Sequence, residues 1–111
     1  MGSLRFLKTD QDFAAMRASK SFGTKVLKIR VHFRPNQNTP RFGFIVPKKV
    51  LPKVVDRNLL KRRIKSVLQK SVARLKNVDI VFYPQKELVK KRFIDLESEV
   101  MELFSKANIW K

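Results

Sequence analysis

Apolar and polar residues alternate along residues 26–34, with four apolar side chains on one side and four polar ones, three of them cationic, on the other. This period of two predicts a half-buried strand with a cationic outer face. Two further strands are predicted over residues 41–47 and 78–84, the last of them short and apolar. Residues 35–40 are dense in turn formers. The first two strands would be antiparallel if this loop closes a hairpin.

Three other segments show the helical period. Residues 9–19 are predicted as a short helix with Phe13 and Met16 on its buried side. Residues 54–75 and 87–107 are predicted as longer helices, because their apolar residues recur at three- and four-residue steps. These residues are Leu60, Ile64, Val67, Leu68, Val72 and Leu75 in the first, and Val89, Phe93, Leu96, Val100 and Leu103 in the second.

The resulting order is helix, strand, strand, helix, strand, helix, with a turn or a brief strand at residues 21–23. It predicts a small α+β sandwich in which helices cover a sheet. A length of 111 residues suits a single domain over 1–111 that buries its own core. No apolar run approaches the roughly 18 residues of a membrane span, and no apolar signal segment follows the first residues. The absence of Cys excludes disulfides and fits a reducing, cytoplasmic location.

The formal charge of +17 indicates that this domain binds a polyanion. Such a charge repels itself in a compact chain, so it is expected to meet nucleic acid or an anionic membrane. The charge is also uneven, because most of the acids fall in the last predicted helix. We therefore expect one side of the molecule to face the polyanion and another side not to.

Protein-borne catalysis is disfavoured by the residue types. The single His, His32, lies among cations on a predicted strand and is expected to be an exposed strand residue. Glu99 and Glu102 are spaced like solvated helix-surface charge, and Asp56 suits the first turn of a helix, where it complements the helix dipole. Three scattered glycines make no phosphate-binding loop, and no carboxylates cluster as a metal-dependent nuclease requires. No catalytic residue and no metal site is assigned to the protein.

Nucleic-acid binding has a stronger basis in "KKVLPKVVDRNLLKRRIK", residues 48–65. Arg57, Lys61 and Lys65 are like charges at successive i+4 steps, an arrangement that destabilises a helix unless an anion relieves it. Asn58 suits a directed hydrogen bond to RNA or, equally, a place near the helix start. The expected RNA-binding residues are Lys48, Lys49, Arg57, Asn58, Lys61, Arg62 and Lys65.

Exposed aromatic residues can stack unpaired bases. Phe42 and Phe44 alternate on a predicted strand, a pattern more typical of core packing. Most aromatic residues are accordingly assigned to the core, and Phe13, Phe22 and Phe44 are kept as candidates for a cleft that binds a single strand.

Residues 42–68, "FGFIVPKKVLPKVVDRNLLKRRIKSVL", resemble the signature region of the bacterial ribonuclease P protein subunit. That family has a strand with a Gly, a Lys-Lys pair, then Arg-Asn-Arg and Lys-Arg on a helix. "DF" at residues 12–13 and "KSF" at 20–22 follow the family order, so the resemblance covers nearly the whole chain. Three positions depart from it: Leu59 and Lys65 stand where the family has Arg, and Arg17 where some members have an aromatic residue. The matching positions are Gly43, Lys48, Lys49, Arg57, Asn58, Lys61 and Arg62.

The resemblance implies a ribosomal protein S5 domain 2-like fold with a left-handed β-α-β crossover. It also implies that a large RNA with its own Mg²⁺ ions removes the 5′ leader of precursor tRNA. The protein would hold that RNA through the Arg-Asn helix, and the leader along a cleft of sheet and helix. The implied partners are ribonuclease P RNA and the precursor tRNA leader, with no membrane and no protein partner required.

Three alternatives remain beside this reading. A basic ribosomal or rRNA-assembly protein would bind RNA without any effect on precursor tRNA. A membrane-surface protein would place its cations opposite exposed aromatic residues on one helix, whereas the helix over 54–75 is expected to face a core. A free-standing nuclease would need acids or His that the chain lacks in the required arrangement.

Overall fold

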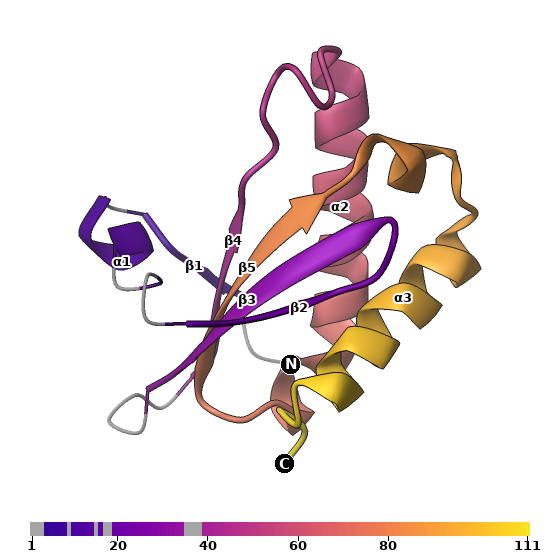
Figure 1. The fold of residues 1–111 in the computed structure, drawn as a ribbon. Helices are drawn as coiled ribbons and strands as arrows, with labels where there is room; N and C mark the ends of the chain where they lie inside the picture. Colours follow the sequence, from indigo (N-terminus) through magenta and orange to yellow (C-terminus); the bar gives the residue numbers. More distant parts are fainter. Residues whose placement is uncertain (1–3, 9, 15, 17–18, 35–38) are drawn as a thin grey trace.

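The computed structural model describes residues 4–8, 10–14, 16, 19–34 and 39–111, which form a five-stranded sheet with two long helices beside it (Figure 1). The predicted order of helices and strands is confirmed, with one extra strand before the first helix and the segment after it also forming a strand. The elements are β1 (Arg5–Phe6), α1 (Asp10–Ala14), β2 (Lys20–Gly23), β3 (Leu27–Phe33), β4 (Arg41–Phe44), α2 (Val54–Ser71), η2 (Val72–Arg74), β5 (Val78–Pro84), η3 (Lys86–Lys90) and α3 (Phe93–Lys106).

The sheet has the order β1-β4-β5-β3-β2, so the last strand in sequence lies at its centre. β5 pairs antiparallel with β3 on one side and parallel with β4 on the other. The predicted hairpin of β3 with β4 is therefore wrong, because β5 lies between the two strands. The seven residues between Phe33 and Arg41 are enough to skip one strand, since neighbouring strands are only about 5 Å apart.

β4, α2 and β5 form a crossover between parallel neighbouring strands, as the family resemblance implies. The left hand of this crossover stays a prediction. Because β4 leads through a loop directly into α2, the residues that follow the strand and those that begin the helix come together at one end of the molecule (Figure 1).

One face of the sheet packs against α2 and α3 and forms the main core. Alternate strand residues point toward the helices, and Ile29, Ile80 and Phe82 are completely buried there. This confirms the α+β class and the apolar stripes predicted for both helices. The helical members that are fully buried are Leu60, Ile64, Val67 and Leu68 from α2 and Leu96, Val100, Leu103 and Phe104 from α3.

The opposite face of the sheet, here called the open face, is covered in part by α1. Leu7, Met16 and Val81 are buried in a second, smaller cluster, and the half-buried Phe13 packs against it, as predicted for the first helix. A Cβ added at Gly43 would lie 3.0 Å from Cε1 of Phe13, so glycine lets the ring approach the β4 backbone closely. The helix was predicted over residues 9–19, and α1 covers Asp10–Ala14 of it; residues 9, 15, 17 and 18 lie outside the described ranges.

Both long helices are shorter than their apolar patterns predict. α2 begins at the predicted Val54 but ends at Ser71, whose hydroxyl donates to the carbonyl oxygen of Val67, and a 3₁₀ turn continues to Arg74. The segment 87–107 divides into η3 and α3, because Arg92 has an extended backbone with ψ of 158°. Helical periodicity continues across such breaks and so does not locate them.

The last residues lie along the start of the η2–β5 connection. The amide of Lys111 donates to the carbonyl of Arg74 at 2.7 Å, and the amide of Lys76 donates to the carbonyl of Ile109 at 2.8 Å. Asn108 has a φ of 55° and ends α3 in the left-handed conformation that Asn tolerates better than most residues. Trp110 thereby packs edge-on against Phe104, with ring centroids 5.5 Å apart.

Candidate nucleic-acid interface

The loop between β4 and α2 presents Lys48 and Lys49, which are both exposed. Its turn is closed by the amides of Val50 and Leu51, which donate to the carbonyl of Pro47 at 3.0 and 3.1 Å. Leu51 is only 3% exposed and fixes the loop to the core. The two lysines are therefore held on an ordered turn.

Arg57, in the first turns of α2, connects the helix to this loop. Its Nη1 donates to the carbonyl oxygens of Leu51 at 2.7 Å and of Pro52 at 3.1 Å. The sequence predicts that Arg57 binds RNA and gives no sign of this tether. A guanidinium has five N–H donors, so the tether leaves others for a phosphate while it fixes the direction of the side chain.

The remaining predicted residues continue along one side of α2. Asn58, Arg62 and Lys65 are exposed, and Lys61 is half-buried. Their offsets of three, four and seven residues place them on the same side of the helix. Lys65 Nζ also lies 5.0 Å from the centroid of the Phe6 ring, a cation–π contact that links the helix to β1.

We call the set formed by these residues with Lys48, Lys49 and Arg57 the α2 face. Within the described ranges, none of its cations forms an ion pair with an acid. The neighbouring Arg63 has a different role, because its Nη1 donates to the carbonyl of Lys91 at 3.1 Å and holds α2 against the segment before α3. All seven predicted RNA-binding residues are exposed or half-buried, on α2 and on the loop that leads into it, and their role in RNA binding stays a prediction.

The three aromatic candidates do not share one surface. Phe22 and Phe44 belong to one row across the sheet, in register with Ile29 and Phe82, and that row faces the helices. Phe44 stacks on Phe82 with a centroid distance of 5.5 Å. Phe13 lies on the open face, so no single cleft contains all three rings. The register of the strands, which the sequence pattern does not reveal, decides this separation.

Around α1, the open face combines aromatic and cationic side chains. Lys28 and Arg30 project from β3 on this side, and Tyr83 on β5 is in register with Lys28 and packs against the cluster that contains Phe13. Arg30 Nε donates to the hydroxyl of Ser19 at 3.1 Å. The predicted cationic outer face of the first strand is thus adjacent to α1. Arg17, which stands where some members of the family have an aromatic residue, lies outside the described residues.

At one end of the open face lies an ionic cluster that the sequence analysis missed. Asp79 is fully buried on β5, and its Oδ1 accepts from Arg34 Nη1 at 2.6 Å and from Arg41 Nε at 3.0 Å. Arg41 Nη2 also donates to Asp79 Oδ2 at 2.9 Å. The available signal was a lone acid within the apolar run "VDIVFYP", because a buried carboxylate requires cationic partners.

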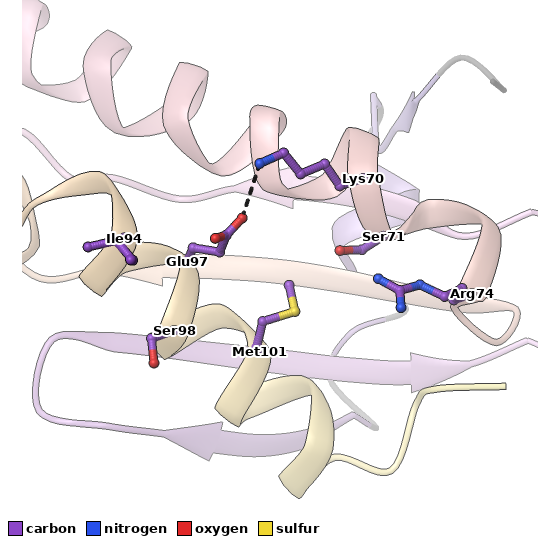
Figure 2. Close-up of a pocket in the computed structure, with 7 residues that line it drawn as sticks. All are labelled: Lys70, Ser71, Arg74, Ile94, Glu97, Ser98 and Met101. Atoms are coloured by element: carbon purple, nitrogen blue, oxygen red, sulfur yellow. Dashed lines mark hydrogen bonds and ion pairs between the residues drawn. The ribbon is translucent and has the colours of Figure 1, made fainter.

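An open pocket of about 450 Å³ lies between α2 and α3 (Figure 2). Lys70 reaches across it to Glu97, with 3.4 Å between Nζ and Oε2. The Ser71 hydroxyl donates to the carbonyl oxygen of Val67 and is not hydrogen-bonded to Lys70 or Glu97, so the pocket does not present an activated nucleophile. The remaining lining residues are Arg74, Ile94, Ser98 and Met101.

The described residues contain no group of three or more His, Cys, Asp or Glu side chains that could hold a metal ion. None of the helices in this part of the chain is both long and apolar enough to cross a membrane.

Comparison with known proteins gives consistent matches along the chain. A family model described as Ribonuclease P matches residues 1–108. The ribonuclease P protein component of Clostridium kluyveri is 32% identical over 109 residues, which cover 95% of this chain and 96% of that protein. The ribonuclease P protein of Staphylococcus aureus has a TM-score of 0.87 at 16% identity, over 98% of this chain and all of that one. The Thermotoga maritima protein has a TM-score of 0.79 at 22% identity, over 92% and 96% of the two chains.

Proposed function

This chain belongs to the ribonuclease P protein family, and we propose that it binds both the catalytic RNA of ribonuclease P and the 5′ leader of precursor tRNA. It is a subunit of the endoribonuclease that forms the mature 5′ end of tRNA. Membership implies association with ribonuclease P RNA.

The α2 face binds the catalytic RNA. The observation that carries this assignment is a row of cations without acidic partners among the described residues, on a helix whose other side is buried at Leu60, Ile64 and Leu68. Burial fixes the direction of the helix, and the tether of Arg57 fixes the adjoining loop. Because the backbone that carries the cations is fixed before binding, less conformational entropy is lost when phosphates replace their counterions.

The leader of the precursor tRNA lies along the open face, beside α1. Phe13 and Tyr83 offer rings on which unpaired bases stack, and Lys28 and Arg30 offer positive charge for the backbone. Phe22 and Phe44 border the opposite face and have contacts with the core, so we assign them a minor part in leader binding.

The protein supplies binding and the RNA supplies the chemistry. Magnesium ions bound to the RNA stabilise the charge that develops at the cleaved phosphate, and no residue of this chain takes a catalytic role. By placing positive charge between two RNA molecules, the protein reduces their repulsion, so the holoenzyme needs less Mg²⁺ than the RNA alone. We further propose that residues 1–111 act as one domain in the cytoplasm, without a protein partner.

Reconstitution tests this proposal directly. Protein, a bacterial ribonuclease P RNA and precursor tRNA are mixed at low Mg²⁺, and release of the leader is followed on a gel. We expect efficient cleavage by the complex, slow cleavage by the RNA alone and no cleavage by the protein alone. A ribosomal or rRNA-assembly protein would leave the rate of the RNA unchanged. Cleavage by protein that has been rigorously freed of RNA would overturn the division of roles.

A further inference from the structure

The three connections at one end of the sheet all carry exposed lysines. β4 and β5 are parallel and β3 is antiparallel to β5, so the loop after β4, the segment after β5 and the turn before β3 lie at the same end. The α2 face already includes two lysines of the first connection. The other two connections are joined, because the amide of Gln85 donates to the carbonyl of Val26 at 3.0 Å. Lys25 and Lys86, the next residues on either side, therefore lie on neighbouring segments.

Both of these connections are held by contacts of their own. In the turn before β3, the amide of Thr24 donates to the carbonyl of Leu27 at 2.8 Å, and the Leu27 amide donates to the Thr24 hydroxyl at 3.2 Å. In η3, Leu88 is 0% exposed and anchors the segment in the core. The backbone that carries the lysines is thus fixed, while their side chains are exposed.

Four lysines gather at this place with a single acid, Glu87. We call these lysines the η3 surface, and they are Lys25, Lys86, Lys90 and Lys91. Within the described ranges, none of the four forms an ion pair. Arg92, the next residue along the chain, differs because its Nε pairs with Asp95 at 3.1 Å. Since like charges on neighbouring segments repel, the η3 surface favours the approach of an anion.

The η3 surface lies on the other flank of α2 from the α2 face. Arg63 follows Lys61 by two positions and so projects about 200° around the helix from it. Its Nη1 donates to the carbonyl of Lys91 at 3.1 Å, which holds the end of this segment against α2. On the α2 face, by contrast, Lys65 reaches the Phe6 ring of β1. RNA that follows the α2 face alone would therefore leave the η3 surface uncovered.

We propose that the η3 surface binds a second stretch of RNA backbone, so that RNA contacts α2 from both flanks. Lysine is a compact point charge without a planar fork or a ring, which suits phosphate oxygens rather than the edges or faces of bases. The catalytic RNA and the precursor tRNA present the same phosphodiester, and their separate affinities identify which of them binds. The inference rests on the proposed function, in which this chain binds both RNAs.

Lys86→Ala combined with Lys90→Ala removes two charges of the η3 surface and none of the α2 face. Affinity for the RNA that this surface contacts should fall by about 5- to 30-fold. The slope of log K against log salt should become shallower by about 1 for each phosphate contact that is lost. Binding is measured at several salt concentrations, and circular dichroism checks that the variant is folded.

Lys106→Ala combined with Lys111→Ala is the matched control. It removes the same charge, but α3 leads away from η3 over 14 residues, or about 20 Å, before it reaches Lys106 (Figure 1). Both affinities should stay within about threefold of those of the natural protein, because charges beyond about 8 Å are screened at physiological salt. Equal losses in the two double variants would show that total charge governs binding, and would refute the η3 surface.

Two separate measurements identify the RNA. Filter retention of ribonuclease P RNA without tRNA reports the first, and a loss there assigns the phosphates to the catalytic RNA. If that affinity is unchanged and the reconstituted holoenzyme binds precursor tRNA less tightly, the phosphates belong to the substrate. An unchanged affinity in both measurements refutes the inference.

Lys61→Ala combined with Arg62→Ala, measured alongside, separates this inference from the proposed function. If the natural protein binds neither RNA, the proposed function is wrong, and the η3 surface with it. If the change on the α2 face weakens binding and the change on the η3 surface does not, the proposed function stands and the η3 surface is refuted. Losses in both of these variants, with none in the control, support RNA on both flanks of α2.

Discussion

α2 and α3 bury their apolar sides in the same core and expose opposite charges. Within α2, six residues are cationic and one is acidic, whereas α3 contains four acids and one lysine. Both helices lie on the same face of the sheet (Figure 1). Since α3 buries its apolar side in the same core with acids outside, burial does not require cations on the outer side of a helix. The mutual repulsion of the α2 cations therefore indicates a partner that is anionic.

The largest effect expected from this comparison is on stability and should be equal in the two helices. Ile64→Ala in α2 and Leu96→Ala in α3 each truncate a side chain that is 0% exposed. Each should lower the free energy of unfolding by about 2–5 kcal/mol through lost burial and the cavity left behind. Urea unfolding followed by circular dichroism measures both. A loss below about 1 kcal/mol in either would show that this helix is not held by the core.

RNA affinity should distinguish the helices. Lys61→Ala combined with Arg62→Ala removes two cations from the α2 face and should weaken binding of ribonuclease P RNA by about 10- to 100-fold. Arg57 is left intact because it also tethers the loop. Binding is measured by filter retention at several salt concentrations, and the unfolding temperature should not change.

The control for that double variant removes the same charge elsewhere. Lys106 and Lys111 are both exposed, one at the end of α3 and one at the last position of the sequence. Replacing both by Ala should change RNA affinity by less than about threefold, because exposed charges beyond about 8 Å from the phosphates are screened at physiological salt. Equal losses in the two double variants would mean that total charge, not the α2 face, controls binding.

Adding cations to α3 should have a still smaller effect. Glu102→Lys with Ser98→Lys adds three positive charges to the exposed side of that helix. We expect ribonuclease P RNA to bind within about twofold of the natural protein at physiological salt, because α3 is distant from the bound phosphates. A large gain in affinity would show that RNA reaches this side of the molecule.

The smallest effect concerns the ion pair between the helices. Lys70 and Glu97 are 65% and 32% exposed and 3.4 Å apart. Glu97→Gln should lower the free energy of unfolding by no more than about 1 kcal/mol, because solvent screens an exposed pair. Thermal unfolding at low and high salt measures this, and a larger loss would contradict the view that the pair only bridges the pocket mouth.

The sequence predicts local elements well and their pairing poorly. β5 has the predicted limits and α2 begins at the predicted residue, because alternation and helical periodicity are local properties. The position of β5 between β3 and β4 depends on which strands β5 pairs with after the chain returns from α2, and this pairing joins residues that are distant in the sequence. β1 has only two residues, too few to show a period, and it is defined by pairing with β4.

In the candidate site, too, local features were predictable from the sequence and contacts between distant residues were not. The cations of the α2 face were predictable, because one helix displays them at regular spacing. The tether of Arg57 and the grouping of Arg34 with Arg41 and Asp79 were not, because they join residues through loops and across three strands. The separation of Phe13 from Phe22 also required the register of the sheet.

Trp110, the chain's one tryptophan, gives the molecule a built-in optical probe. Its ring packs against Phe104, and the Arg74 guanidinium carbon lies 5.4 Å from its centroid, on the side of the last helix rather than beside α1. Its emission should therefore follow the melting of the core while remaining nearly constant as RNA is added. A single sample can thus report folding by fluorescence and binding by a labelled RNA, each without disturbing the other.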